Sequence, residues 1–246
     1  MIQGHEKVAL CFSGGKDSLA CLYLVRDQLS EITVLWANTG KNYPETLAII
    51  ESVKAMCPRW QEVRVDRDAQ WTRSGMPSDL VPMDATVHGR GCTAAQGTSI
   101  QSQYACHYEN ISEPLTKAIE DLGATLVITG QRKDEAHRAP RANGDRVGAV
   151  QFWHPIDDWT RQQVLAFLES AMGGLPAHYA FDHTSLDCYD CTGFAAASHD
   201  RVAWMRERHP ILFEDYREKL LTLYREIETP LKQYQRLREE VAYEQC

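Results

Sequence analysis

The sequence predicts an α/β fold, in which a doubly wound and mostly parallel sheet carries a helical C-terminal extension. Three observations predict it. Short apolar runs, typical of buried strands, alternate with amphipathic stretches as far as about residue 157. Beyond that point the pattern is largely helical. The chain has 246 residues, 43% of them hydrophobic, which is enough for one large domain with an appendage.

In the first half, strands are expected at residues 8–12, 32–37 and 63–65. The first apolar run stops at Ser13 and two glycines, and leucines at helical spacing follow. A helix is expected from Pro44 onward, because proline is tolerated in a first helical turn. Residues 66–104 are rich in Gly, Ser, Thr and Pro and receive no assignment. A loop of this length within a compact domain is usually functional.

In the second half, residues 115–122 predict a helix and residues 126–130 a buried strand. Thr160 and Gln163 form a capping box that opens a helix over 164–171, and Gly173 ends it. The remaining third is helical, with a break expected at Thr229 and Pro230. Apolar residues at 220, 224, 227, 231, 234 and 241 form one stripe. Packing on the chain's own domain explains such a stripe, and a homodimer is the alternative.

Composition excludes several classes of protein. Thirty-four acidic residues against 26 Lys and Arg give a net charge of −8, which excludes a nucleic-acid binder held by bulk positive charge. No apolar run reaches the roughly 18 residues of a membrane span. The N-terminal residues lack a signal-peptide cleavage site, so a cytoplasmic protein is expected. In that compartment the eight cysteines are thiols or metal ligands rather than disulfides.

The segment Ser13-Gly14-Gly15-Lys16-Asp17-Ser18 lies between an expected strand and helix. Two glycines let successive N–H groups converge on an anion, and the helix N-terminus adds its positive dipole. The spacing differs from the Walker pattern. A plain tight turn is the alternative, but it requires neither the lysine nor the two serines. The segment therefore predicts an anion-binding loop.

Two further clusters carry chemistry. Five basic residues between Arg132 and Arg146 predict an anion-binding segment, with a solvated charged loop as the alternative. The pair Cys188 and Cys191 forms a CxxC, which predicts metal binding or redox chemistry in a cytoplasmic chain.

Four motifs in this order resemble those of a known family. Ser13–Ser18 resembles the SGGxDS pyrophosphate loop of the ATP pyrophosphatase superfamily. Asn38-Thr39-Gly40, Gly130-Gln131-Arg132 with Asp134-Glu135, and Pro155–Thr160 narrow the resemblance to the branch of phosphoadenosine phosphosulfate (PAPS) reductase. The resemblance covers residues 8 to about 195.

The resemblance implies an adenine nucleotide at the carboxyl ends of the strands, as expected at the switch point of an open α/β sheet. It places the base and ribose near Asn38, Thr39 and Gly40, and the phosphates over Ser13–Ser18 and Gly130. Arg132 and Arg138 would reach a negative group of the substrate. On this basis the nucleotide-binding domain is expected to span residues 1–185, and the CxxC segment with the C-terminal helices residues 186–246.

The family's iron–sulfur reductases hold a 4Fe–4S cluster with an early Cys-Cys pair and a late CxxC. Here the early pair reads Ala105-Cys106, which leaves Cys106, Cys188 and Cys191 as ligands. Three thiolates can hold a cluster with one iron open. Cys92 is the candidate for a fourth ligand, and zinc or metal-free thiols are the alternatives. Cys246 resembles the reductases' tail nucleophile, although the family's tail continues beyond that cysteine.

Three functions follow from the resemblance. The first is an ATP-dependent enzyme that uses Mg²⁺, releases AMP and pyrophosphate, and transfers sulfur to an activated acceptor, either a nucleic-acid base or a small molecule. The intact loop favours it, because adenylyl sulfate has no pyrophosphate and the family's reductases have a degenerate loop. The second is an adenylyl-sulfate or phosphoadenylyl-sulfate reductase that releases sulfite, and the third is a nucleotide-binding regulatory or cluster-bearing subunit. The expected catalytic residues are Lys16, Asp17, Cys106 and Arg132, and a sulfur or electron donor protein is an expected partner.

Overall fold

The computed structural model describes residues 1–78, 80–135, 141–180, 186–193, 195 and 199–243. The chain divides into two compact units, one of residues 1–65 and 111–187 and the other of residues 66–110 and 188–246. The second boundary lies close to the division expected after residue 185. Residues 66–110, however, group with the C-terminal part of the chain rather than with the expected nucleotide-binding domain.

The first unit is built on a six-stranded sheet in which only β7 is antiparallel to its neighbour. Val8 of the central strand pairs with Ile32 on one side and with Leu126 on the other. The α/β class with a mostly parallel sheet is therefore confirmed. In sheet order the strands are β3 (Trp60–Arg64), β2 (Ile32–Asn38), β1 (Val8–Cys11), β6 (Leu126–Ile128), β8 (Val150–Trp153) and β7 (Arg146–Val147).

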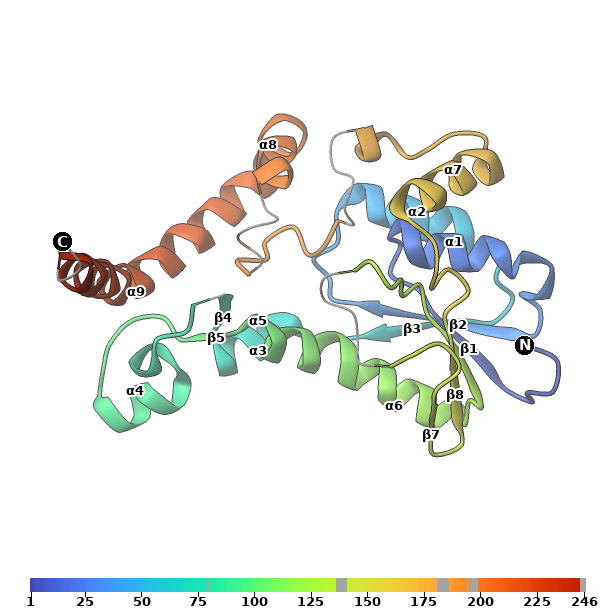
Figure 1. Cartoon of the computed structure of the whole chain (residues 1–246), viewed down its shortest axis with the longest axis horizontal. Coiled ribbons are helices and arrows are strands. Elements are labelled where there is room, and N and C mark those ends of the chain that lie inside the picture. Colours follow the sequence, from blue (N-terminus) through green and yellow to red (C-terminus); the bar gives the residue numbers. More distant parts are fainter. Residues whose placement is uncertain (79, 136–140, 181–185, 194, 196–198, 244–246) are drawn as a thin grey trace. The chain divides into compact units, whose positions relative to one another are not determined.

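Helices cover both faces of this sheet, as Figure 1 shows. On one face, Leu10 and Val34 of the sheet pack with Leu22, Ile50 and Leu168 of the covering helices. These helices are α1 (Lys16–Leu24), α2 (Pro44–Lys54) and α7 (Arg161–Met172). On the other face, the sheet packs against α6 (Glu113–Leu122). Elsewhere in the chain, short helical turns occur at Arg26–Gln28, Tyr108–Ser112 and Ala177–Ala180. Burial on both faces explains why the strands read as continuous apolar runs.

The strand order reverses between β1 and β6, because the chain leaves β1 toward β2 and returns on its other side as β6. In open α/β sheets, ligands bind outside the carboxyl ends of the strands at such a point. The loop after β1 and the segment after β6 both lie there.

The second unit contains the whole of the segment, residues 66–104, that the sequence left unassigned. Its core combines Met76, Ala85, Ile100 and Leu223. The elements are α3 (Arg67–Ser74), β4 (Met76–Ser78), a turn at Met83–Ala85, α4 (Val87–Thr93), β5 (Ile100–Ser102), α5 (Gln103–His107), α8 (His199–Arg208) and α9 (Pro210–Tyr243). Strands β4 and β5 form a separate parallel pair.

The break expected at Thr229 and Pro230 is wrong, because α9 runs through Pro230 as one helix. A proline inside a helix removes one backbone hydrogen bond but does not always end the helix. Among the described residues, no helix has the length and apolar character needed to cross a membrane.

Candidate nucleotide pocket and thiol cluster

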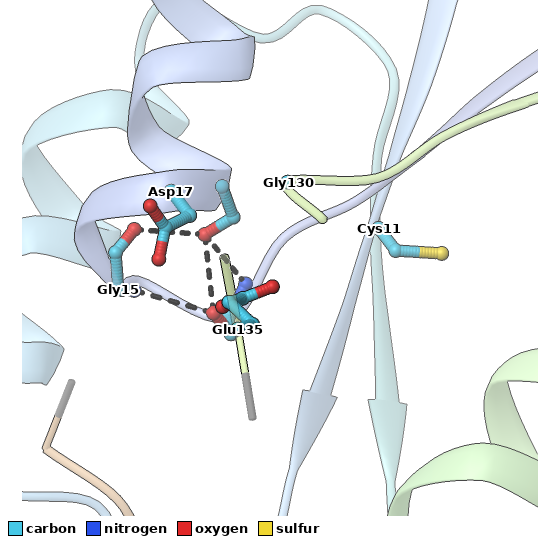
Figure 2. Close-up of a pocket in the computed structure, with 7 residues that line it drawn as sticks. Cys11, Gly15, Asp17, Gly130 and Glu135 are labelled. Atoms are coloured by element: carbon cyan, nitrogen blue, oxygen red, sulfur yellow. Dashed lines mark hydrogen bonds between the residues drawn. The ribbon is translucent and has the colours of Figure 1, made fainter. Parts of the chain in front are cut away.

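The loop between β1 and α1 is organised by its two serines. The Ser18 hydroxyl donates to the carbonyl of Gly15 (3.0 Å) and accepts from the Ser13 backbone N–H (3.2 Å). The two hydroxyl oxygens are 3.1 Å apart (Figure 2). Gly14 has φ +82°, a conformation that favours glycine. No side chain caps Gly15, which precedes α1, so the first N–H groups of the helix are available to an anion.

Asp17, in the first turn of α1, forms ion pairs with two cationic side chains. Its carboxylate accepts from Lys16 Nζ at 3.0 Å and from Arg132 Nε at 2.8 Å. All three residues are less than 9% exposed. Arg132 also pairs with Asp134. The structure thus brings together Lys16, Asp17 and Arg132, which are three of the four expected catalytic residues, in one buried charge cluster.

A pocket of about 200 Å³ opens at the loop (Figure 2). Asp17 lines it from below the loop and Glu135 from the segment after β6. Burial raises the pKa of the Glu135 carboxyl, and the negative charge of Asp17 adds to that effect. The lining residues are Cys11, Ser13, Gly15, Asp17, Ser18, Gly130 and Glu135.

Gly130 lets the segment after β6 pass close to the start of α1. A Cβ at this position would lie 2.5 Å from the carbonyl carbon of Asp17 and 2.6 Å from the nitrogen of Ser18. Backbone cannot yield at such distances, so any larger residue would push the two segments of the pocket apart.

Asn38, Thr39 and Gly40 follow β2, the strand next to β1. The Asn38 side chain holds its own turn, since its oxygen accepts from the Gly40 N–H (2.8 Å) and its nitrogen donates to Glu62 (2.8 Å). The three residues are absent from the lining of the pocket at the loop. Arg138, the other expected substrate-binding arginine, lies outside the described residues.

In the second unit, N–H donors surround the sulfur of Cys106. Trp71 Nε1 donates to Cys106 Sγ at 3.3 Å, and Asn110 Nδ2 lies 3.6 Å from the same sulfur. Burial raises the pKa of the Cys106 thiol, the Trp71 N–H lowers it, and negative charge on Cys188 raises it. Cys106 and Cys188 therefore influence each other electrostatically.

Asp190, inside the CxxC, anchors this turn to two helices. Its fully buried carboxylate accepts from Arg67 of α3 at 2.5 Å and from Lys219 of α9 at 2.6 Å. The Arg67 guanidinium also lies 4.1 Å from the Trp71 ring centre. Burial alone would raise the pKa of Asp190, but the hydrogen bonds and charges of Arg67 and Lys219 hold it below its usual range.

The seven described cysteines are thiols, and Cys188 and Cys191 are half-buried. Cys92 is exposed on α4. Within the described residues, no group of three or more His, Cys, Asp or Glu side chains is placed to hold a metal ion. The described residues thus show N–H groups at the Cys106 sulfur but no assembled set of metal ligands. Cys246 lies outside the described residues.

A family model described as the phosphoadenosine phosphosulfate reductase domain matches residues 7–194. The chain belongs to this family. The match covers the loop, the segment after β6 and the CxxC. The pocket at the loop and the cysteines Cys106, Cys188 and Cys191 therefore lie within the PAPS reductase domain.

Relatives of this PAPS reductase domain protein agree with the match. It is 23% identical over 192 residues to an adenosine 5'-phosphosulfate reductase of Burkholderia cepacia, covering 76% of this chain and 70% of the relative. It is 26% identical over 168 residues to a phosphoadenosine 5'-phosphosulfate reductase of Alkalilimnicola ehrlichii, covering 66% and 60%. A crystal structure of the Candida auris PAPS reductase in a phosphate complex aligns with TM-score 0.48 and 15% identity, over 71% of this chain and 76% of that one.

Sequence reasoning missed two pocket residues of this PAPS reductase domain. Glu135 belongs to the motif that begins at Gly130 but received no role, and Cys11 lies in the apolar run at residues 8–12, which predicts only a strand. Cys11 lines the pocket, and burial raises the pKa of its thiol to about 12. Its position at the end of β1, just before the loop, is the feature that could have identified it.

Proposed function

We propose that the chain is a reductase of an adenylyl sulfate, the mixed anhydride of AMP and sulfate, with or without a 3'-phosphate. The observation that carries the proposal is the family match over residues 7–194, together with curated relatives that are reductases of these two compounds. The comparisons favour this function over the ATP-dependent one that the intact loop predicts.

In this proposal the nucleotide binds at the pocket after β1. Uncapped N–H groups at the start of α1 and the hydroxyl of Ser13 would donate hydrogen bonds to its anionic groups, while the Ser18 hydroxyl, which donates to the Gly15 carbonyl, holds the loop in shape. Asp17 holds Arg132 and Lys16 in place beneath the loop, so their positive charge offsets the carboxylates that line the pocket.

The chemical step is attack by a cysteine thiolate on the sulfur of the sulfate. The new S–S bond forms as the bond between that sulfur and the bridging oxygen breaks, and AMP leaves with the electron pair. A dithiol reductant then releases sulfite and becomes a disulfide, which balances the two-electron reduction. The candidate nucleophiles are Cys106, Cys188, Cys191 and, outside the described residues, Cys246.

A second candidate function is ATP-dependent activation of an acceptor followed by sulfur transfer. The specific observation is that two carboxylates, Asp17 and Glu135, line the pocket beside an intact loop. Carboxylate oxygens together with phosphate oxygens are the usual ligands of Mg²⁺. In this case the acceptor would be a nucleic-acid base or a small molecule, and a partner protein would donate the sulfur.

The two functions differ in the nucleotide they need, so binding by calorimetry separates them. Adenylyl sulfate, its 3'-phosphorylated form and Mg-ATP are titrated into the full chain, and sulfite, AMP and pyrophosphate are assayed with a dithiol present. We expect tighter binding of an adenylyl sulfate, sulfite release, and at least tenfold weaker binding by Ser18→Ala. Ser52→Ala is the matched control. The Ser52 hydroxyl donates a hydrogen bond to the Ile49 carbonyl within α2, and Ser52 does not line the pocket.

Pyrophosphate formation from Mg-ATP without sulfite release would contradict the reductase proposal and favour the ATP-dependent function. Binding with no turnover of either compound would indicate a regulatory subunit.

As a cofactor we propose a 4Fe–4S cluster held by Cys106, Cys188 and Cys191. The N–H groups of Trp71 and Asn110 at Cys106 support it, because hydrogen bonds to sulfur tune such clusters. When bound, a cluster with an open iron supplies a site for an anionic or sulfur ligand. Cys92 is the candidate for a fourth ligand, and four-thiolate zinc and metal-free thiols are the alternatives.

Anaerobic reconstitution tests the cofactor. We expect about four iron and four sulfide per chain and a cluster absorption and paramagnetic spectrum that Cys106→Ala and Cys188→Ala abolish. Cys57→Ser, in the other unit, is the control and should retain the cluster. Zinc without iron, or no metal, would contradict the proposal.

A further inference from the structure

The pocket at the loop is large enough for only part of a nucleotide. Its volume is about 200 Å³, whereas pockets for whole small-molecule ligands begin at roughly 300 Å³. The uncapped N–H groups at the start of α1 fit the anionic group of the nucleotide. The sugar and the base therefore extend beyond the lined volume, along the carboxyl ends of the neighbouring strands.

The two sides of the loop differ in the space that they leave for the sugar. On the β6 side, a Cβ at Gly130 would lie 2.5 Å from the carbonyl carbon of Asp17, so backbone closes that side. On the β2 side, apart from the chain neighbours of Gly40, no described residue has an atom within 4 Å of a Cβ built at Gly40. A nucleotide held by its anionic group at β1 therefore carries its sugar across the turn after β2, toward β3. Two strand spacings, about 10 Å, separate β1 from β3.

A chain of hydrogen bonds joins this turn to β3. The Asn38 side-chain oxygen accepts from the Gly40 N–H at 2.8 Å, and the Asn38 side-chain nitrogen donates to Glu62 Oε1 at 2.8 Å. Arg64 Nε donates to the same Glu62 oxygen at 3.0 Å. Asn38 pairs with Arg64 in the sheet, and Glu62 lies two residues before Arg64, on the same face. The Glu62 carboxylate thus lies beside the turn that the sugar crosses.

Glu62 carries a fixed negative charge and an oxygen that a ligand can use. The hydrogen bonds from Asn38 and Arg64 hold the pKa of the Glu62 carboxyl below its usual range. Among the described residues, Oε1 receives both of these short hydrogen bonds, and Oε2 receives a long one from Arg64 Nη2 at 3.5 Å. In dinucleotide-binding folds, a carboxylate beside the sugar accepts from a ribose hydroxyl, whereas an arginine accommodates a ribose phosphate.

We propose, on the basis of the proposed function, that Glu62 selects the adenylyl sulfate that lacks a 3'-phosphate. Glu62 Oε2 accepts a hydrogen bond from a ribose hydroxyl of this substrate. A 3'-phosphate at the same place would meet the carboxylate, and like charges repel. Arg64 would have to leave its ion pair with Glu62 to bind that phosphate, so the pair discriminates against it.

Lys41 is the other cation of this turn. Its backbone N–H donates to Thr39 Oγ1 at 3.4 Å, so it follows the residues that the sugar crosses. Its charge attracts any phosphate, including the anionic group that both substrates share. A test of Glu62 therefore retains Lys41 in every variant and compares two nucleotides, so that the contribution of Lys41 is the same throughout.

AMP and adenosine 3',5'-bisphosphate test the proposal, because they differ only in the 3'-phosphate and are the nucleotides that the two substrates release. Calorimetry at one ionic strength measures their binding to the full chain. We expect AMP to bind at least about tenfold more tightly, as for one hydrogen bond to a charged group. Glu62→Gln should bring the two dissociation constants within about threefold of each other, because it removes the charge and releases Arg64. Adding Arg64→Ala to Glu62→Gln should abolish the gain in affinity for the bisphosphate.

Glu31→Gln is the matched control. It removes the same charge from the same unit, at the opposite end of β2, and should leave the ratio of the two dissociation constants unchanged. Equal or tighter binding of the bisphosphate by the natural protein overturns the proposal. An unchanged ratio in Glu62→Gln also overturns it, and AMP binding by each variant verifies that the variant is folded.

Failure of the proposed function would appear in a different measurement. Neither test nucleotide contains sulfur, so the ratio of their dissociation constants does not depend on the reaction. Absence of sulfite release from both adenylyl sulfates would contradict the reductase. Sulfite release together with an unchanged ratio in Glu62→Gln would contradict the role of Glu62 alone.

Discussion

At the scale of single residues, the pair Arg67 and Asp190 is the most deeply buried ion pair that the described residues contain. Their side chains are 1% and 0% exposed, and one oxygen of Asp190 has no hydrogen-bond partner among these residues. The pair fixes the CxxC turn to α3, so it positions Cys188 and Cys191 rather than contacting substrate. Breaking a buried pair leaves an uncompensated charge, which costs far more than breaking a surface pair.

We therefore expect Asp190→Asn to lower the free energy of unfolding by about 3 kcal/mol, as measured by urea denaturation at neutral pH. Glu214→Gln is the control, because the ion pair of Glu214 with Arg217 is exposed on both sides. That substitution should cost about 0.5 kcal/mol or less. Equal effects of the two substitutions would show that Asp190 does not stabilise the second unit.

The residue-level site was partly predictable from the sequence. Ser13–Ser18 are consecutive, so their loop could be identified from the local pattern of two glycines, a lysine and two serines. The pairing of Asp17 with Arg132 joins residues 115 positions apart, and no local pattern reports such a contact. The same holds for Asp190, whose partners come from α3 and α9.

At the scale of elements, periodicity predicted the parts that bury a regular face. The strands at 8–11, 32–38 and 126–128 and the helix α6 lie where expected, and Thr160 and Gln163 form the expected capping box. The third strand is β3 at Trp60–Arg64, shifted toward the N-terminus from the expected 63–65. Its residues are only partly buried, so hydrophobic pattern marks this edge strand poorly.

Elements without a strong apolar period could not be predicted. Helix α3 contains three charged residues in eight and lies in the segment left unassigned, although Asp66 caps it by accepting from the Ala69 N–H. In α9 the expected break at Pro230 relied on local propensity. Flanking helical turns on both sides of the proline outweighed the loss of one hydrogen bond.

At the scale of the whole molecule, the chemistry is divided between two compact units. The candidate nucleotide pocket belongs to the unit of residues 1–65 and 111–187, and the described thiols Cys106, Cys188 and Cys191 belong to the other. Each unit also contains a carboxyl with a shifted pKa, Glu135 in the first and Asp190 in the second.

These two carboxyls shift the pH dependence of stability in opposite directions. The pKa of Glu135 is raised in the folded chain, so its contribution to stability is full below its unfolded pKa of 4.5 and is lost as pH rises through the folded pKa. The pKa of Asp190 is lowered, so its contribution is full above its unfolded pKa of 3.8 and is lost as pH falls through the folded pKa.

Through these two groups, the free energy of unfolding of the nucleotide-free chain should rise as pH falls through the folded pKa of Glu135 toward 4.5, and decline as pH falls below 3.8. Urea denaturation at a series of pH values measures it, and two variants assign the two limbs. Glu135→Gln should flatten the limb above pH 4.5, because the amide does not titrate. Asp190→Asn should weaken the acid limb while leaving the other unchanged. If Glu135→Gln kept the full slope above pH 4.5, the Glu135 carboxyl would not be the group that titrates there.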